Sequence, residues 1–127
     1  MKWLRKLLAT EPRQKRFGLP KEQIKQLVYG YGGCIASDMI TVQGLPVGFM
    51  YREKPHNDMD SGWRFLSGRE SDEYMANSKN HEVYDINTIA NYDQSIIPLL
   101  ESPVGSAFER PVAGAQFVPV HNWKVSK

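Results

Sequence analysis

Two matching segments, residues 46–53 and 103–110, most constrain how this chain can fold. Each begins with Pro-Val-Gly and continues through an aromatic residue to one acidic and one basic residue. Proline restricts φ and glycine permits positive φ, so each copy is expected to enter a β-strand through a tight bend. Side chains alternate between the two faces of a strand. The pattern therefore predicts a compact sheet between residues 33 and 118, with Tyr51 and Phe108 buried.

Charged residues close both segments. Arg52 precedes Glu53 in the first segment, and Glu109 precedes Arg110 in the second. We expect Arg52 and Glu109 to be more exposed than the aromatic residues before them. If the two strands are neighbours, these four charges can form a cross-strand network, or they can form the polar rim of a binding surface.

The composition favours several short elements over a helical bundle. The 127 residues include eight prolines and ten glycines, and 41% of the residues are apolar, which allows a real core within one domain. β-Favouring runs predict strands at residues 34–42, 46–53, 63–66, 83–86 and 117–118. Helical patterns predict helices at residues 20–29 and 70–77, and a helix or paired turns at 87–100. We predict a single α+β domain in which helices pack on a mainly antiparallel sheet of four to six strands.

The net charge of +2 conceals an asymmetry along the chain. Residues 1–16 contain six basic residues and one acidic residue, whereas the remainder contains ten basic and thirteen acidic residues, a net charge of −3. A mildly acidic domain is not typical of a nucleic-acid-binding protein. We therefore divide the chain into a basic N-terminal arm at residues 1–17 and a domain at residues 18–127, and expect no nucleic-acid partner.

The arm carries the pattern of a short amphipathic helix, with Trp3, Leu4, Leu7 and Leu8 on one face. Such a helix can lie on a membrane surface or pack on its own domain. Eight residues bury too little apolar area for stable lipid binding, so no membrane contact is expected from residues 1–8. The apolar runs are too short to cross a bilayer, and no secretory signal is recognisable. The single Cys34 excludes an intrachain disulfide, and we expect a cytoplasmic protein.

The chain carries no standard catalytic or metal-binding signature. His56–Asp60 places one imidazole and two carboxylates in a polar loop, but their spacing fits neither a calcium loop nor a zinc site. Ser37, His81 and Asp85 provide the groups of a nucleophilic triad, yet no Gly-x-Ser-x-Gly elbow surrounds a serine. Residues 29–33 are glycine-rich but lack the strand and the Lys-Ser/Thr ending of a phosphate-binding loop. We expect neither an enzyme nor a bound metal or cofactor.

Several longer motifs carry a family resemblance, and they occur in a fixed order: Ser37–Ile40, Gly44–Gly48, Asp60–Phe65, Asn87–Asp93 and Ser102–Arg110. Over about residues 33–118 the chain resembles immunity-protein family thirty-three, long catalogued as a bacterial domain of unknown function. The resemblance implies a bacterial immunity protein that binds and blocks a cognate toxin without catalysis. It brings no catalytic residues to this chain.

An immunity protein that acts by occlusion needs a surface for its toxin. Acidic groups accelerate encounter with a basic toxin, and an aromatic side chain supplies a desolvated anchor. We therefore predict partner contacts from an acidic loop, the strand that follows it and a polar segment further along: Glu53, Asp58, Asp60, Trp63, Arg64, Asn87, Asn91, Tyr92 and Asp93. Trp63 beside Phe65 also fits a core position, and asparagine and aspartate also cap turns.

The alternative function is a small-molecule-binding domain or a component of an uncharacterised enzyme. A ligand site is a concave apolar pocket with a few convergent polar groups, whereas a toxin-binding surface is broader and acidic or aromatic. The sequence identifies neither a toxin nor a small ligand, and it does not specify an oligomeric state.

Overall fold

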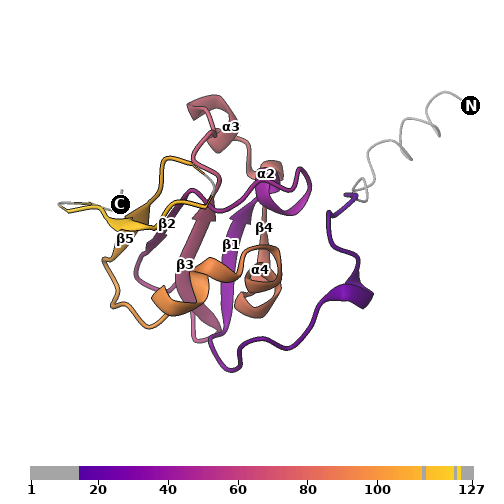
Figure 1. The fold of residues 1–127 in the computed structure, drawn as a ribbon, viewed down its shortest axis with the longest axis horizontal. Helices are drawn as coiled ribbons and strands as arrows, with labels where there is room; N and C mark the ends of the chain where they lie inside the picture. The colour runs from indigo at the N-terminus through magenta and orange to yellow at the C-terminus, as the bar shows by residue number, and fades with distance from the viewer. Residues whose placement is uncertain (1–14, 113, 122, 124–127) are drawn as a thin grey trace, which may run out of the picture.

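The computed structural model describes residues 15–112, 114–121 and 123. The amphipathic helix predicted at residues 2–9 lies outside these described residues. The described residues form six strands, three short α-helices and three 3₁₀ helices (Figure 1): η1 Lys21–Gln23, β1 Gly33–Ser37, α2 Asp38–Thr41, β2 Phe49–Arg52, β3 Asp60–Leu66, α3 Asp72–Ala76, η2 Ser78–Asn80, β4 His81–Asp85, α4 Ile86–Tyr92, η3 Gln94–Leu99, β5 Ala107–Glu109 and β6 Val118–Pro119.

The strands form one sheet in the order β4-β1-β3-β2-β5-β6. Only β1 and β3 run parallel, and the other four pairings are antiparallel. This architecture confirms the predicted α+β class with a mainly antiparallel sheet. Figure 1 shows α4 lying in front of β1 and β3, so one face of the sheet is covered by helices.

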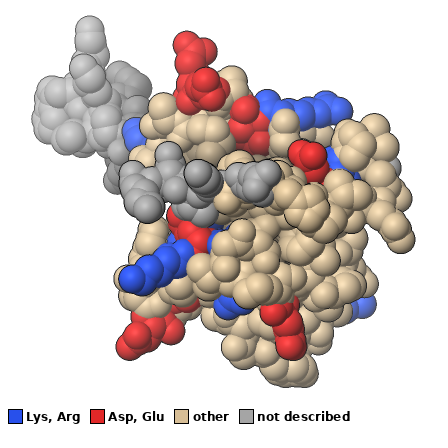
Figure 2. All heavy atoms as spheres, turned by 90° about the vertical axis from the view of Figure 1, so that its left-hand side faces the viewer, with Lys and Arg blue, Asp and Glu red and all other residues tan. Residues whose placement is uncertain are grey.

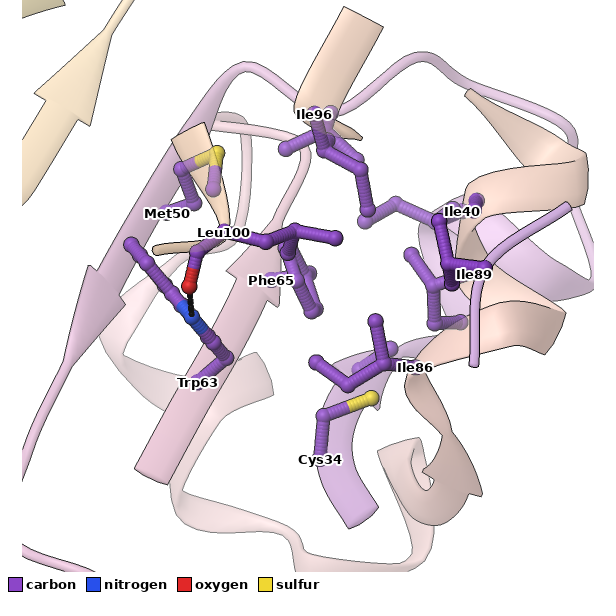
Figure 3. Close-up of a cluster of buried hydrophobic side chains, with 13 residues drawn as sticks. Cys34, Ile40, Met50, Trp63, Phe65, Ile86, Ile89, Ile96 and Leu100 are labelled. Atoms are coloured by element: carbon purple, nitrogen blue, oxygen red, sulfur yellow. Dashed lines mark hydrogen bonds between the residues drawn. The ribbon is translucent and has the colours of Figure 1, made fainter. Parts of the chain in front are cut away.

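The hydrophobic core lies between the sheet and these helices. Trp63 and Phe65 of β3 are fully buried there and stack at 6.1 Å with an interplanar angle of 19°. The indole Nε1 of Trp63 donates a 3.0 Å hydrogen bond to the carbonyl oxygen of Leu100, as Figure 3 shows. Aliphatic side chains from α2, α4 and η3 fill the remaining space: Ile40, Ile86, Ile89 and Ile96.

The two Pro-Val-Gly segments enter β2 and β5, as predicted, and these strands are antiparallel neighbours. Gly105 has a φ of +100°, which favours glycine. Gly48 serves a different purpose, because a Cβ at this position would lie 2.1 Å from the carbonyl oxygen of Ser67. Tyr51 and Phe108, which were predicted to be buried, are half-buried, and Glu109 is exposed as expected.

The four charges that close the segments do not pair with one another. Antiparallel pairing places Glu109 opposite Phe49, at the far end of the ladder from Arg52. The Arg52 guanidinium instead donates to the carbonyl oxygens of Ser61 and Ser102, and it lies 5.9 Å from the centre of the Trp63 ring. Arg52 is therefore half-buried.

The helix predicted at residues 20–29 is wrong beyond its first turn. Only η1 forms, and residues 24–28 are not helical. The Asn87 side chain accepts from the backbone N–H groups of Leu27 and Val28 and donates to the carbonyl oxygen of Lys25. These long-range bonds satisfy backbone groups that a helix would otherwise pair, so tertiary contacts override the local pattern.

Two predicted element boundaries also differ from the structure. The strand expected at residues 34–42 ends at Ser37, because its hydroxyl accepts from the N–H of Met39 and caps α2. The strand expected at residues 63–66 begins earlier, at Asp60, where β3 is bridged to Gly33 of β1. Three other predicted elements are confirmed with shifted ends, namely the strands near residues 83–86 and 117–118 and the helix near residues 70–77.

The close approach at Gly48 generates a testable prediction. Gly48→Ala forces the new methyl group against the backbone of Ser67, and we expect a loss of about 2 kcal/mol in the free energy of unfolding. Gly18→Ala is the matched control, since its Cβ would meet Thr41 and Tyr92 at an ordinary 3.5 Å. Urea denaturation measures both variants, and equal stability of the two would contradict the contact.

Candidate functional site

The sheet has a second face that no α-helix covers as extensively as the core face. Because side chains alternate along strands, the residues between the core positions point to this side. Ile35 lies between Cys34 and Ala36, and Arg64 lies between Trp63 and Phe65. We call this side the open face. It is partly covered at β2, where the Trp123 ring packs 5.2 Å from that of Tyr51.

A groove of about 470 Å³ runs along the open face beneath α3. Its apolar lining comes from several strands and from α3, namely Ile35, Tyr51, Leu66, Met75, Ala76 and Val83. Its polar lining includes Glu53, Arg64, His81 and Glu82. The groove is therefore an apolar trough with charged groups along its margin.

A second hollow of about 680 Å³ adjoins the groove and shares Ile35 and Val83 with it. Its walls are the loop at His56–Asp60, the glycine-rich residues 30–33 and the end of β4 at Asp85. We call the two hollows together the open-face surface. It extends across β4, β1 and β3 and onto the acidic loop that the sequence analysis selected.

The open-face surface combines exposed apolar residues with acidic ones. Met59 is 80% exposed and Val83 is 74% exposed, and both line the second hollow. The acidic residues of the lining are Glu53, Asp58, Asp60, Glu82 and Asp85. Arg64 is the only lysine or arginine among the described residues that line either hollow. The surface is thus apolar at its centre and negatively charged around it.

Arg64 does not give the surface a free positive charge. Its side chain is buried, with Nε 2.5 Å from Glu53 and the two terminal nitrogens 3.0 and 2.8 Å from the Asp60 carboxylate. Hydrogen bonds from Arg64 lower the pKa of Asp60 well below its ordinary value, and the N–H groups of His56 and Gly62 add to this effect. Two carboxylates thus neutralise one guanidinium, and the cluster keeps a net negative charge.

Charges are distributed differently at the opposite edge of the sheet. Figure 2 views the molecule from the side of β5 and β6, and acidic and basic side chains appear there in small groups among uncharged residues. The acidic excess of residues 17–127 is therefore not concentrated at that edge.

The groups of the hypothetical triad do not converge. Ser37 and His81 are paired across β1 and β4, but Asp85 lies at the other end of β4, where it is paired with Gly33. Four residues of strand separate His81 from Asp85, about 13 Å. The Asp85 carboxylate instead accepts from the N–H of Asn87 and caps α4.

Cys34 is buried in the core, as expected for a cysteine that packs as a small apolar residue. Burial raises the pKa of its thiol above the ordinary value, which opposes formation of the reactive thiolate. Among the described residues, no group of three or more His, Cys, Asp or Glu side chains is arranged to hold a metal ion.

Five of the predicted partner residues belong to the other side of the sheet. Trp63 is fully buried, so its predicted role as an exposed anchor is wrong, because its alternation with Arg64 places it in the core. Asn87 and Asn91 bind the backbone of Lys25 and its neighbours. The Tyr92 hydroxyl accepts from the N–H of Leu19.

Asp93, the fifth of these residues, is also occupied by the fold. Its carboxylate accepts from the N–H groups of Val47 and Ser95 and forms an ion pair with buried Arg110. Of the nine predicted residues, Glu53, Asp58 and Asp60 lie on the open-face surface. Arg64 lies beneath it and, being buried, is also unable to act as an exposed contact.

The sequence analysis missed the apolar residues of the open-face surface. Met59 and Val83 each interrupt a polar stretch. The signal that could have found them was an apolar residue beside acidic ones, since Met59 lies between Asp58 and Asp60 and Val83 follows Glu82. The position of α4 determines which face of β4 is covered. No local sequence pattern predicts that position.

Comparison with known proteins assigns the family. A family model described as the immunity protein Imm33 domain matches residues 34–121. This span is more than half of the 127 residues, and the chain belongs to the Imm33 immunity-protein family. The match confirms the resemblance drawn from the motifs, and it contains all six strands except the first residue of β1.

No curated protein and no solved structure matches the chain. Within the residues that the structure describes, no helix combines the length and the apolar character required to span a bilayer.

Asn87 provides a test of the structural role assigned to the 87–93 segment. Asn87→Ala leaves the backbone N–H groups of Leu27 and Val28 without their acceptor, so we expect a loss of about 2 kcal/mol in unfolding free energy. Thr88→Ala, one residue along α4, is expected to change stability by less than about 0.5 kcal/mol. Chemical denaturation of both variants checks this, and a fully stable Asn87→Ala protein would refute the assigned role.

Asp60 provides a pH-dependent test. A carboxylate with a lowered folded-state pKa stabilises the protein above its unfolded pKa of about 4, and this stabilisation is lost as the pH falls through the folded-state value. Asp60→Asn should therefore cost about 2 kcal/mol at pH 7, and the difference from wild type should shrink below about pH 4. Asp58→Asn is the control, because its side chain accepts no hydrogen bond from the described residues, and it should match wild type at neutral pH.

Proposed function

We propose that this chain is an immunity protein that neutralises a toxin by binding it at the open-face surface, without catalysing a reaction. The observation that carries the proposal is the combination of exposed Met59 and Val83 with a surrounding acidic margin, in a member of an immunity-protein family. Apolar residues at the centre and charged residues at the rim are the usual arrangement of a protein-binding surface.

The charge of the surface supports a basic partner. Glu82 is paired with Lys15, so the surface has four carboxylates, Glu53, Asp58, Asp60 and Asp85, against the one paired guanidinium of Arg64. This excess attracts a positively charged toxin surface and accelerates its encounter with the chain. The groove then accepts an apolar or aromatic side chain of the toxin, which would contact Val83 and Met75. A desolvated contact of this kind carries most of the affinity, while the acidic rim selects the partner.

A small-molecule site is the second candidate, because the groove has the volume of a ligand pocket. Its polar groups favour the toxin proposal over this one. Arg64 is bound to Glu53 and Asp60, so it has little capacity left to orient a ligand. We further propose that the protein acts in the cytoplasm, which the single, buried and unpaired Cys34 supports.

Co-expression with the product of an adjacent candidate toxin gene tests the proposal. Wild-type chain should restore growth and co-purify with the toxin. Asp58→Lys should weaken the complex at least about tenfold, chiefly by slowing association at low salt. Met59→Ala should weaken it by a similar factor through faster dissociation.

Glu22→Lys is the charge-matched control, because Glu22 is exposed in η1 outside both hollows. It should bind as wild type does. Thermal denaturation must show that all three variants are folded. Unchanged binding by Asp58→Lys and Met59→Ala would place the toxin elsewhere, and binding of a small metabolite in the groove instead of any toxin would favour the second candidate.

A further inference from the structure

Strand β4 is an edge of the sheet, and part of its backbone has no partner among the residues that the structure describes. It pairs with β1 in a register that places Cys34 opposite Tyr84 and Ala36 opposite Glu82. The N–H of Ile86 donates to the carbonyl oxygen of Gly32 at 2.9 Å. Hydrogen bonding alternates along an antiparallel ladder, so Glu82 and Tyr84 bond to β1, while Val83 and Asp85 direct their backbone groups outward.

In the described part of the chain, the ladder with β1 leaves the backbone N–H and C=O of Val83 and the N–H of Asp85 without a partner. The C=O of Asp85 is used within the chain, because Asp85 is the N-cap residue of α4 and its carbonyl accepts the first hydrogen bond of that helix. The N–H of His81 is used locally by the carbonyl oxygen of Ser78. Lys15 binds the Glu82 carboxylate at 3.0 Å and also reaches Asp38, so it lies on the core-facing side of the strand. Among the described residues, the outward N–H and C=O of Val83 and the N–H of Asp85 are thus left open.

The two edges of the sheet differ in their protection. The opposite edge, β6, contains only two residues, and one of them is Pro119. Short strands and prolines are common protections of an edge against pairing with another strand. Strand β4 has five residues and no proline, and its central Val83 is 74% exposed. This edge has the features of a strand that pairs with another chain.

We propose that two copies of this chain pair through β4, antiparallel about a twofold axis at Val83, and so join their sheets into one. The partner strand is the same strand because its sequence is self-complementary in this register. Val83 meets Val83 of the second copy, and His81 lies opposite Asp85, an imidazole opposite a carboxylate. Glu82 lies opposite Tyr84, so no like charges face each other directly.

The neighbouring registers lack this complementarity. A shift of two residues in one direction places Glu82 directly opposite Glu82 of the second copy, and like charges in that position are destabilising. The opposite shift sets Val83 against Asp85 and loses the apolar pair. The strand sequence therefore selects the register centred on Val83.

The pairing has a consequence for the open-face surface. A twofold axis perpendicular to the sheet keeps the same face of both copies on the same side. The two open-face surfaces then adjoin across the Val83 pair, each with its own acidic margin. The dimer does not depend on toxin binding, so either proposal can fail without the other.

The experiment measures molar mass against concentration with the full chain, using sedimentation equilibrium. Wild type should rise from the monomer mass of 14.5 kDa towards twice that value. Val83→Pro should stay monomeric, because its lost N–H makes no bond within the protomer but is needed between copies. Val83→Lys should also stay monomeric, since two lysines would meet at the axis.

Val118→Lys on β6 is the matched control and should dimerise as wild type does, because Val118 is an exposed valine at the other edge. Circular dichroism establishes that each variant is folded. If Val83→Pro does not fold, Val83→Lys still tests the proposal. A wild type that remains monomeric at every concentration overturns the proposal. Dimers of Val83→Lys as stable as wild type, or loss of dimers in Val118→Lys, also overturn it.

Crosslinking tests the register directly. In the proposed dimer the Cα atoms of the two Val83 residues are about 5.5 Å apart. Val83→Cys should therefore link two chains by oxidation or with a short bifunctional maleimide, while Val118→Cys should not. Cys34 is buried and should not react. Failure of Val83→Cys to crosslink in a solution that contains dimers would show that the copies pair elsewhere.

Discussion

The fold depends on the three consecutive residues at the centre of β3. This strand is bonded to β1 on one side and β2 on the other, so its side chains can only alternate between the two faces. Trp63 and Phe65 enter the core, where the indole also bonds to the carbonyl oxygen of Leu100. Arg64 must then be buried on the opposite face, and this is possible only because Glu53 and Asp60 neutralise it. The same strand therefore orders both the core and the acidic margin of the open-face surface.

Polar residues have different tasks on the two sides of the sheet. On the covered side they complete the fold: Asn87 holds an irregular N-terminal segment, and Asp93 joins η3 to Arg110 and the backbone of Val47. Their bonding capacity is used within the chain, which leaves little for a partner. On the open face Asp58 and Asp85 are exposed. A toxin-binding surface built from the second group does not compete with the bonds that stabilise the domain.

Several features were predictable because they depend on local chemistry. The Pro-Val-Gly segments lead into strands, alternation places Trp63 with Phe65, and Ser71 begins the short helix α3. The helix predicted after Pro20 does not form beyond its first turn. Its backbone N–H groups at Leu27 and Val28 instead donate to the side chain of Asn87, about sixty residues later. The same residue explains why the 87–93 segment was misjudged as a contact surface. A polar side chain in a sequence looks equally available whether it will bind a partner or its own backbone.

By itself, the sequence determined the fold class, the family and the alternation that separates Trp63 from Arg64. These follow from backbone geometry, from residue patterns within a few positions and from long motifs. Only the tertiary structure decided which face is covered, which acidic groups are already paired, and that β4 lies at an edge with Val83 exposed. The reason is physical: burial and hydrogen bonding depend on elements far apart in the chain, so exposure is settled only when the helices and strands are placed against one another.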